Sequence, residues 1–96
     1  MYGTIAKLRV KPGMENELER LSREEQTEIE GIAFQYVYRM DDDPQDLYLV
    51  VGFDSKESYH KNAESPEQHT RYLSMLDLLE REPEWHDGEI VFSVQS

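Results

Sequence analysis

The side chains in this sequence that can do acid–base chemistry are its 3 histidines and 6 tyrosines. A neutral imidazole has an ordinary pKa of about 6.5, so a histidine beside a bound phenol can accept its proton at neutral pH. Tyrosine hydroxyls can hydrogen-bond to the oxyanion that results. His69 is the candidate base, and the candidate hydrogen-bonding tyrosines are Tyr36, Tyr59 and Tyr72. The alternative is that His69 satisfies a hydrogen bond in the core and that the tyrosines only pack.

The sequence lacks the residues and motifs that several other kinds of active or metal site require. Cysteine is absent, which excludes disulfides, thiolate metal sites and cysteine nucleophiles and is compatible with a reducing cytoplasm. Neither His60 nor His86 has a metal-ligand partner at helical spacing, and a grouping of His60, His69 and Glu64 matches no zinc motif. No serine lies in a nucleophile-elbow motif, and no glycine-rich loop could hold a phosphate. We therefore expect no metal site.

The length and net charge of the chain limit the kinds of partner that it can bind. The 96 residues are expected to form a single domain, residues 1–96, and their formal net charge of -11 repels nucleic acid and anionic membranes. No apolar run approaches the roughly 20 residues that span a bilayer. Residues 1–5 lead straight into a strand pattern without the features of a signal peptide. We expect a cytoplasmic protein that binds neither nucleic acid nor membrane.

Four strands are predicted from alternating side chains. Residues 4–10 and 32–39 each alternate, and residues 47–53 are apolar on both faces, which is typical of a central strand. In the second strand, alternation places Ile32 on the same face as three aromatic residues. These aromatic residues are Phe34, Tyr36 and Tyr38. Residues 90–94 alternate again and predict the fourth strand, after an irregular connection over residues 80–88.

Three helical segments are predicted between the strands. The first runs from Met14 to about Thr27, after the turn residues Pro12 and Gly13. Asp54, with a glutamate three residues later, predicts the cap of a second helix, and Ser65-Pro66 predicts the start of a third. The expected buried stripe of the third helix comprises His69, Tyr72, Leu73, Leu76 and Leu79.

The order strand, helix, strand, strand, helix, strand predicts an α+β fold of the ferredoxin-like type, with a four-stranded antiparallel sheet. Right-handed crossovers place the helices on one face of that sheet. The other face carries the aromatic residues of the second strand and is too apolar to be covered by water alone. We therefore expect a homodimer through the sheet face, burying about 800 Å² per subunit.

Three motifs together resemble the antibiotic biosynthesis monooxygenase (ABM) domains. They are the strand ending in Lys11-Pro12-Gly13-Met14 before a Glu-rich helix, the segment Phe53-Asp54-Ser55-Lys56-Glu57-Ser58-Tyr59, and the Ser65-Pro66 helix start. The resemblance spans nearly the whole chain. It implies a dimeric α+β barrel in which each subunit has a pocket between its sheet and its helices.

The resemblance also implies a choice of chemistries: cofactor-independent oxidation of electron-rich aromatics, heme degradation, or binding without reaction. Heme-degrading relatives use a strand-one asparagine, a tryptophan at the start of the crossover helices and a histidine ten residues beyond it. Tyr59 and His69 match that spacing, but Ala6 stands in the asparagine's place and Tyr59 in the tryptophan's. Heme binding through His69 is therefore favoured over heme degradation, as an alternative to the cofactor-free reaction.

We expect a cofactor-independent monooxygenase acting on a hydrophobic aromatic small molecule, such as a quinol or a polyketide-like compound. The alternative is a non-enzymatic dimeric module that binds a small molecule or heme. The expected catalytic residues are His69 and Tyr59, and the expected substrate contacts are Phe34, Tyr36, Tyr72 and Leu76. Trp85 is expected to close the end of the barrel or to contact the partner subunit, with a pocket lid as the alternative.

Overall fold

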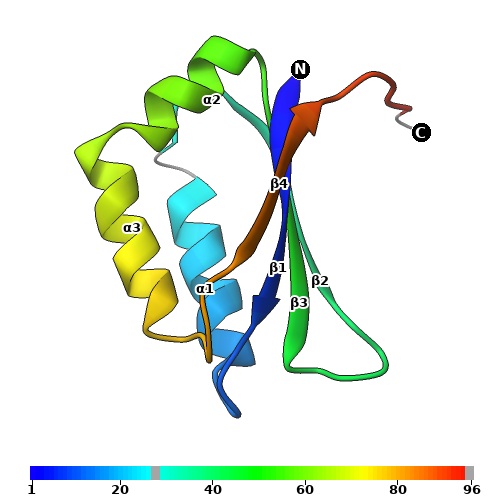
Figure 1. The fold of residues 1–96 in the computed structure, drawn as a ribbon, viewed down its shortest axis with the longest axis vertical. Helices are drawn as coiled ribbons and strands as arrows, with labels where there is room; N and C mark the ends of the chain where they lie inside the picture. Colours follow the sequence, from blue (N-terminus) through cyan, green and yellow to red (C-terminus); the bar gives the residue numbers. More distant parts are fainter. Residues whose placement is uncertain (27–28, 95–96) are drawn as a thin grey trace.

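The structure is a computed structural model that describes residues 1–26 and 29–94. Its described residues form one four-stranded antiparallel sheet in the order β2-β3-β1-β4, and all helices lie on one side of it (Figure 1). The strands are β1 (Tyr2–Arg9), β2 (Ile32–Arg39), β3 (Asp46–Phe53) and β4 (Glu84–Glu89), and the helices are α1 (Glu15–Gln26), α2 (Lys56–Ala63) and α3 (Pro66–Leu76). This order confirms the predicted ferredoxin-like α+β fold.

The core forms where β1 and β3 face the helices. Ala6, Leu8 and Val10 are 0%, 1% and 0% exposed, as expected for one face of an alternating strand. The other buried members of this cluster are Leu18, Leu47 and Leu79. β3 lies between β2 and β1, which confirms that the strand with two apolar faces is internal.

The starts of α2 and α3 are set by serine caps. Ser65 accepts a hydrogen bond from the backbone N–H of Gln68 at 3.1 Å and precedes a proline at the first helical position, as predicted. In α2 the cap is Ser55, which accepts from the N–H of Ser58 at 3.0 Å, so the prediction of Asp54 as the cap is wrong by one residue. The predicted end of the first helix at Thr27 falls outside the described residues.

The fourth strand lies earlier than predicted. β4 spans Glu84–Glu89, so Trp85 and His86 belong to a strand and the irregular connection before it is shorter. Residues 90–94 follow the strand. The strongly exposed apolar side chains among them are Val91 (86%), Phe92 (80%) and Val94 (76%).

The prediction placed the fourth strand too late because β4 is an edge strand whose position is set by backbone pairing with β1. All six of its residues are exposed, so hydrophobic alternation carries no information about it. Its backbone pairs with β1 from Glu84 to Glu89, opposite Lys7 to Tyr2. The apolar alternation of residues 90–94 lies beyond this pairing, and apolar side chains without a partner strand do not make a strand.

A β-bulge in β2 changes which residues share a face. Ile32 pairs with Phe53, whereas Phe34 pairs with Gly52. Cross-strand partners project to the same face, so Ile32 joins the helix-covered face and Phe34 joins the open face. The prediction that Ile32 lies on the same face as Phe34 is therefore wrong, because the bulge inserts an extra residue between them.

The open face of the sheet carries large apolar side chains. Phe34 and Tyr36 stack there with ring centroids 5.3 Å apart. Ile5, Tyr36 and Tyr38 are 50%, 53% and 53% exposed. Figure 1 shows that none of the described helices covers this side of the sheet.

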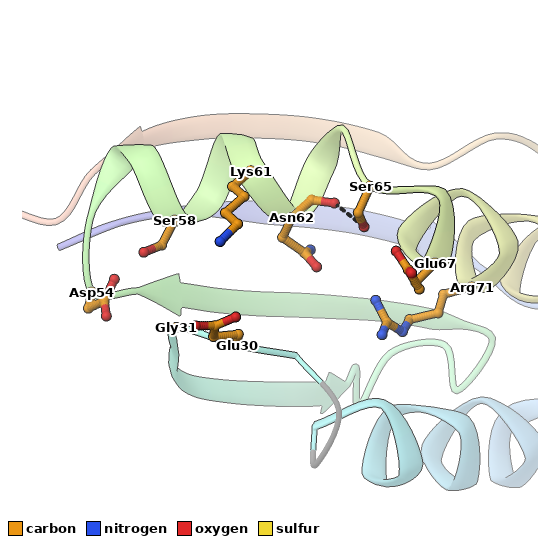
Figure 2. Close-up of a pocket in the computed structure, with 9 residues that line it drawn as sticks. All are labelled: Glu30, Gly31, Asp54, Ser58, Lys61, Asn62, Ser65, Glu67 and Arg71. Carbon is orange, nitrogen blue, oxygen red and sulfur yellow. Dashed lines mark hydrogen bonds between the residues drawn. The ribbon is translucent and has the colours of Figure 1, made fainter.

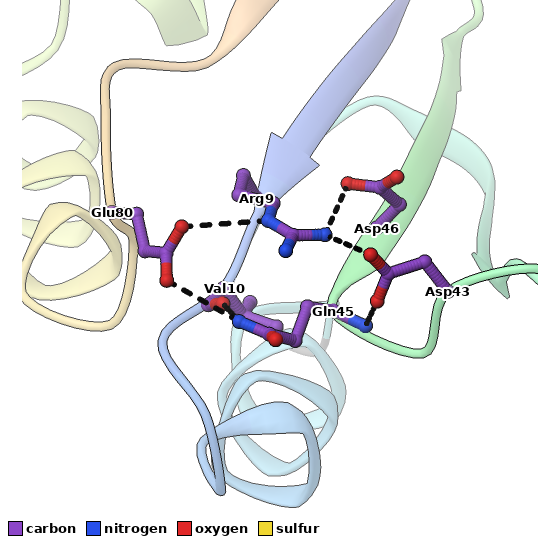
Figure 3. Close-up of polar contacts among 6 residues, drawn as sticks. All are labelled: Arg9, Val10, Asp43, Gln45, Asp46 and Glu80. Atoms are coloured by element: carbon purple, nitrogen blue, oxygen red, sulfur yellow. Dashed lines mark hydrogen bonds and ion pairs between the residues drawn. The ribbon is translucent and has the colours of Figure 1, made fainter.

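An ion-pair cluster links the end of β1 to the β2–β3 turn, to the start of β3 and to the connection before β4 (Figure 3). The Nη1 atom of Arg9, at the end of β1, lies 2.6 Å from a carboxylate oxygen of Asp43 and 3.0 Å from one of Asp46. Its Nε atom lies 3.4 Å from a carboxylate oxygen of Glu80. One guanidinium thus joins the β2–β3 turn and the connection that leads to β4.

No helix of the described residues is long and apolar enough to cross a membrane.

Candidate functional site

A cavity of about 320 Å³ lies between the sheet and the helices α2 and α3. This volume is at the lower end of the about 300–1,000 Å³ usual for small-molecule sites. The sheet contributes apolar side chains to its wall. They are Ile32, Leu49, Val51 and Phe53. The polar residues on the wall come from both layers: Thr4, Gln35, Tyr59, Asn62, Gln68 and His69. An apolar wall with a few polar groups is the usual design of a site for a small organic ligand.

A second, polar cleft of about 470 Å³ lies between the helices α2 and α3 and the segment that precedes β2 (Figure 2). Three carboxylates and two cations line it. These charged residues are Glu30, Asp54, Glu67, Lys61 and Arg71. None of the catalytic or substrate-contact residues predicted from the sequence lines this cleft. We therefore take the smaller cavity as the candidate site.

Tyr59 of α2 reaches the cavity wall and is held there by the sheet. Its ring lies edge-on to Phe53 and Tyr2, with centroids 5.5 Å and 5.2 Å apart. Its hydroxyl donates a hydrogen bond to a carboxylate oxygen of Asp87 at 2.7 Å. Burial, and then this hydrogen bond, raise the pKa of Tyr59 above its ordinary value. Tyr59 therefore keeps its proton at neutral pH and shares it with Asp87.

His69 and Tyr72 of α3 line the same cavity. The structure therefore brings three of the predicted residues, Tyr59, His69 and Tyr72, to one site. The prediction of a buried stripe is nevertheless wrong for His69, which is exposed, and for Leu73, which is 49% exposed. The cavity lies between α3 and the sheet, so this helix has no fully buried residue among those described. His69 thus lines the cavity and also meets solvent.

The other three predicted substrate contacts lie elsewhere. Phe34 and Tyr36 project from the open face of the sheet, on the side opposite the cavity, because the alternation of β2 turns them away from the helices. Leu76 packs against the hydrophobic core below the cavity. The prediction that these three side chains share a pocket with His69 does not agree with where the structure places them.

Sequence reasoning missed several residues of the site. Gln35 could have been found, because it is a polar residue on the helix-facing side of an alternating strand. Trp85 lines the cavity from β4, with its ring centroid 6.4 Å from that of Tyr72. For Trp85 the sequence predicted the end of the barrel or the partner interface, with a pocket lid as the alternative, and the structure places it on the cavity wall. Asp87 gave no usable signal, because the sequence placed it in an irregular connection.

Among the described residues, His69 is the one histidine on this wall whose imidazole could bind heme iron. Ala6, in the place of the asparagine of heme-degrading relatives, is 0% exposed and offers no donor. Within the described part of the chain, no group of three or more histidine, aspartate or glutamate side chains is arranged to hold a metal ion. The residues present therefore suit an organic ligand, and they allow heme through a single protein ligand.

The architecture matches solved structures closely. A candidate antibiotic biosynthesis monooxygenase from Chloroflexus aurantiacus J-10-fl aligns with a TM-score of 0.81 and 23% identity, covering 98% of this chain and 96% of that one. A corresponding protein from Bordetella bronchiseptica gives 0.80 and 19%, covering 95% and 97%. The protein Rv0793 from Mycobacterium tuberculosis gives 0.78 and 18%, covering 98% of both chains.

Comparison of the sequence with protein-family models and with curated proteins finds no match. Structural agreement at such low identity shows the fold and not the reaction. The chain has the α+β fold of ABM domains, so the resemblance that its motifs indicated is confirmed at the level of the fold.

Proposed function

We propose that this protein binds a hydrophobic aromatic small molecule in the cavity between its sheet and α2–α3 and oxidises it with molecular oxygen, without a cofactor. One observation carries the proposal: His69, Tyr59 and Tyr72 converge on a single, mostly apolar cavity of about 320 Å³. The ABM fold supports a monooxygenase and leaves the substrate open. A quinol or a polyketide-like phenol fits the chemistry of the wall.

The reaction needs a base and a substrate that supplies its own electrons. His69 accepts a proton from the substrate, and the resulting carbanion passes one electron to oxygen. The substrate radical and superoxide then combine into a peroxide anion, which takes the proton back from His69. For an anthrone, loss of water from the peroxide leaves a carbonyl. One oxygen atom enters the product and the other leaves as water, so no external reductant is required. Tyr59 and Tyr72 orient the ring.

A homodimer through the open face of the sheet is part of this proposal. The exposed side chains of Ile5, Tyr36 and Tyr38 lie on that face, and no helix within residues 1–26 and 29–94 covers it. Removing such a surface from water stabilises association by roughly 25 cal/mol per Å² of apolar area before the costs of association. A second copy of the chain presents the same surface and can cover it.

A non-enzymatic binding module is the competing function. Its support is that the proton of Tyr59 is already shared with Asp87, so this hydroxyl is less free to stabilise a developing oxyanion. Heme is one ligand that such a module could take. Titration with hemin would then shift the Soret band in the native protein and not in His69→Ala.

The test of catalysis is oxygen consumption with a panel of anthrones and dihydroxyaromatics. We expect turnover by the native protein and a loss of about 100-fold or more in His69→Ala, the usual contribution of a general base. His60→Ala is the matched control, since His60 is exposed and does not line the cavity. Turnover that survives in His69→Ala would remove His69 as the base, and no turnover with any substrate would favour the binding module.

A further inference from the structure

Gln35 of β2 carries an unsatisfied polar atom at the candidate site. Its side chain lines the 320 Å³ cavity and also a small cavity of about 20 Å³ beneath it. Its Oε1 atom is buried and has no hydrogen-bond partner within the part of the chain that the structure describes. A buried acceptor without a donor costs about 1–3 kcal/mol, so such atoms are rare in folded proteins.

Three of the neighbouring side-chain donors, on Ser22, Tyr59 and Asn62, are committed elsewhere. Around the small cavity the wall is largely leucine, and the hydroxyl of Ser22 donates to the backbone carbonyl of Leu18 at 3.0 Å. On the side of the larger cavity, Tyr59 donates its proton to Asp87. The side-chain amide of Asn62 donates to Gln68 at 3.2 Å.

Among the described residues, Gln35 therefore presents to the cavity wall an acceptor that receives no hydrogen bond. A ligand that carries a hydroxyl or an N–H group can supply the missing hydrogen bond, whereas an ether or a quinone carbonyl cannot. The last side-chain torsion of glutamine is soft, so the amide can turn its oxygen toward the larger cavity while β2 stays in place.

We propose that the Oε1 atom of Gln35 accepts a hydrogen bond from the ligand and thereby selects aromatic molecules that carry a hydroxyl or N–H donor. This inference rests on the proposed function, because it assumes that an aromatic ligand occupies the cavity. It assigns a specificity role to a residue that takes no part in the proton transfer. The competing occupant is a water molecule in the small cavity, which has room for one.

The test compares two probes that differ by one donor, 2-naphthol and its methyl ether, by isothermal titration calorimetry. We expect the native protein to bind the naphthol about tenfold more tightly, the difference that one satisfied hydrogen bond makes. Gln35→Met keeps the length of the side chain and removes the acceptor. In this variant the two probes should bind within about twofold of each other.

Gln68→Met is the matched control. Gln68 lines the same cavity, but its oxygen already accepts from Asn62, so this variant should keep the preference for the naphthol. The thermal unfolding midpoint of ligand-free Gln35→Met should equal or exceed that of the native protein, because the substitution removes an unsatisfied acceptor. A midpoint several degrees lower would mean that the oxygen has a partner inside the protein and would overturn the inference.

The remaining outcomes separate this inference from the proposed function. Equal binding of both probes by the native protein, or a preference that persists in Gln35→Met, would overturn the role of Gln35 and leave the ligand site standing. The second result is also the one expected if water alone satisfies the oxygen. Failure of the native protein to bind either probe would overturn the proposed function and this inference with it.

Discussion

The hydroxyl of Tyr59 donates to the carboxylate of Asp87 across 2.7 Å and so joins α2 to the edge strand β4. Asp87 lies opposite Thr4 in the register of β4 with β1, which sets its position beside the cavity. The contact decides how Tyr59 can act. It is a protonated phenol whose proton points to a carboxylate, so toward a ligand its oxygen is mainly an acceptor.

Asp87→Asn should lower the pKa of Tyr59. Burial is the first cause of the raised value and remains in the variant, so the fall should be partial. The measurement is the change in tyrosinate absorbance on alkaline titration, with Tyr59→Phe identifying the contribution of this residue. Glu89→Gln removes a charge from the same strand and should leave the titration of Tyr59 unchanged. An unaltered titration in Asp87→Asn would mean that the carboxylate does not hold the phenol in solution.

The same pair predicts how stability depends on alkaline pH. The pKa of Tyr59 is raised in the folded state, so its contribution to stability is complete below the ordinary tyrosine pKa of about 10 and is lost as pH rises above it. Urea unfolding of the native protein should therefore lose more free energy between neutral and alkaline pH than unfolding of Tyr59→Phe. Equal losses would contradict the prediction.

The ion pairs of Arg9 predict a loss of stability in the opposite pH direction, as pH falls into the acid range. The hydrogen bond from Arg9 is the main cause that lowers the pKa of Asp43. Its contribution to stability is present above the ordinary aspartate pKa of about 3.9 and is lost as pH falls through the lowered value. Asp43→Asn should thus be less stable than the native protein at neutral pH, and the difference should narrow in acid. Asp41→Asn, a change at an exposed position of the same turn, is the control.

Tyr36→Glu should dissociate the proposed dimer. It places a charge on the exposed apolar face that a partner would cover, and burial of an unpaired charge opposes association. Leu73→Glu is the matched control, because Leu73 is similarly exposed, at 49%, but lies on α3. Sedimentation at micromolar concentration should give twice 11.4 kDa for the native protein and for Leu73→Glu, and the single-chain mass for Tyr36→Glu. A native protein of single-chain mass would overturn the dimer.

Gly3→Ala should disrupt the pairing of β1 with β3. A Cβ atom at Gly3 would lie 1.9 Å from the backbone oxygen of Val51, and backbone cannot yield without separating the strands. We expect a loss of about 2 kcal/mol or more in the free energy of unfolding, typical of overpacking. Gly88 of β4 is the partner of Gly3 in the pairing of β4 with β1, and a Cβ atom at Gly88 would meet nothing within 4 Å. Gly88→Ala should therefore be nearly neutral in urea unfolding, and equal losses in both variants would refute this account.

The local patterns that the sequence determines are those in which side chains meet a common core. Alternation placed the first three strands correctly within one or two residues, and the Ser65-Pro66 signal placed the start of α3. Residue chemistry and the resemblance to ABM domains singled out Tyr59, His69 and Tyr72, which the fold brings to one cavity. Hydrophobic periodicity records which face is buried, so it is informative wherever burial selects the residues.

Tertiary structure alone decided the features that depend on a partner distant in the chain. The position of β4 follows from backbone pairing with β1, which exposed side chains do not encode. The bulge after Ile32 separates it from Phe34, and the cavity under α3 leaves His69 in contact with solvent. The hydrogen bond from Tyr59 to Asp87 likewise depends on neighbours that only folding brings together. The same holds for the oxygen of Gln35, which has no hydrogen-bond partner among the residues that the structure describes. A sequence pattern reports the burial of a residue, whereas the identity of its contacts is set when the elements pack.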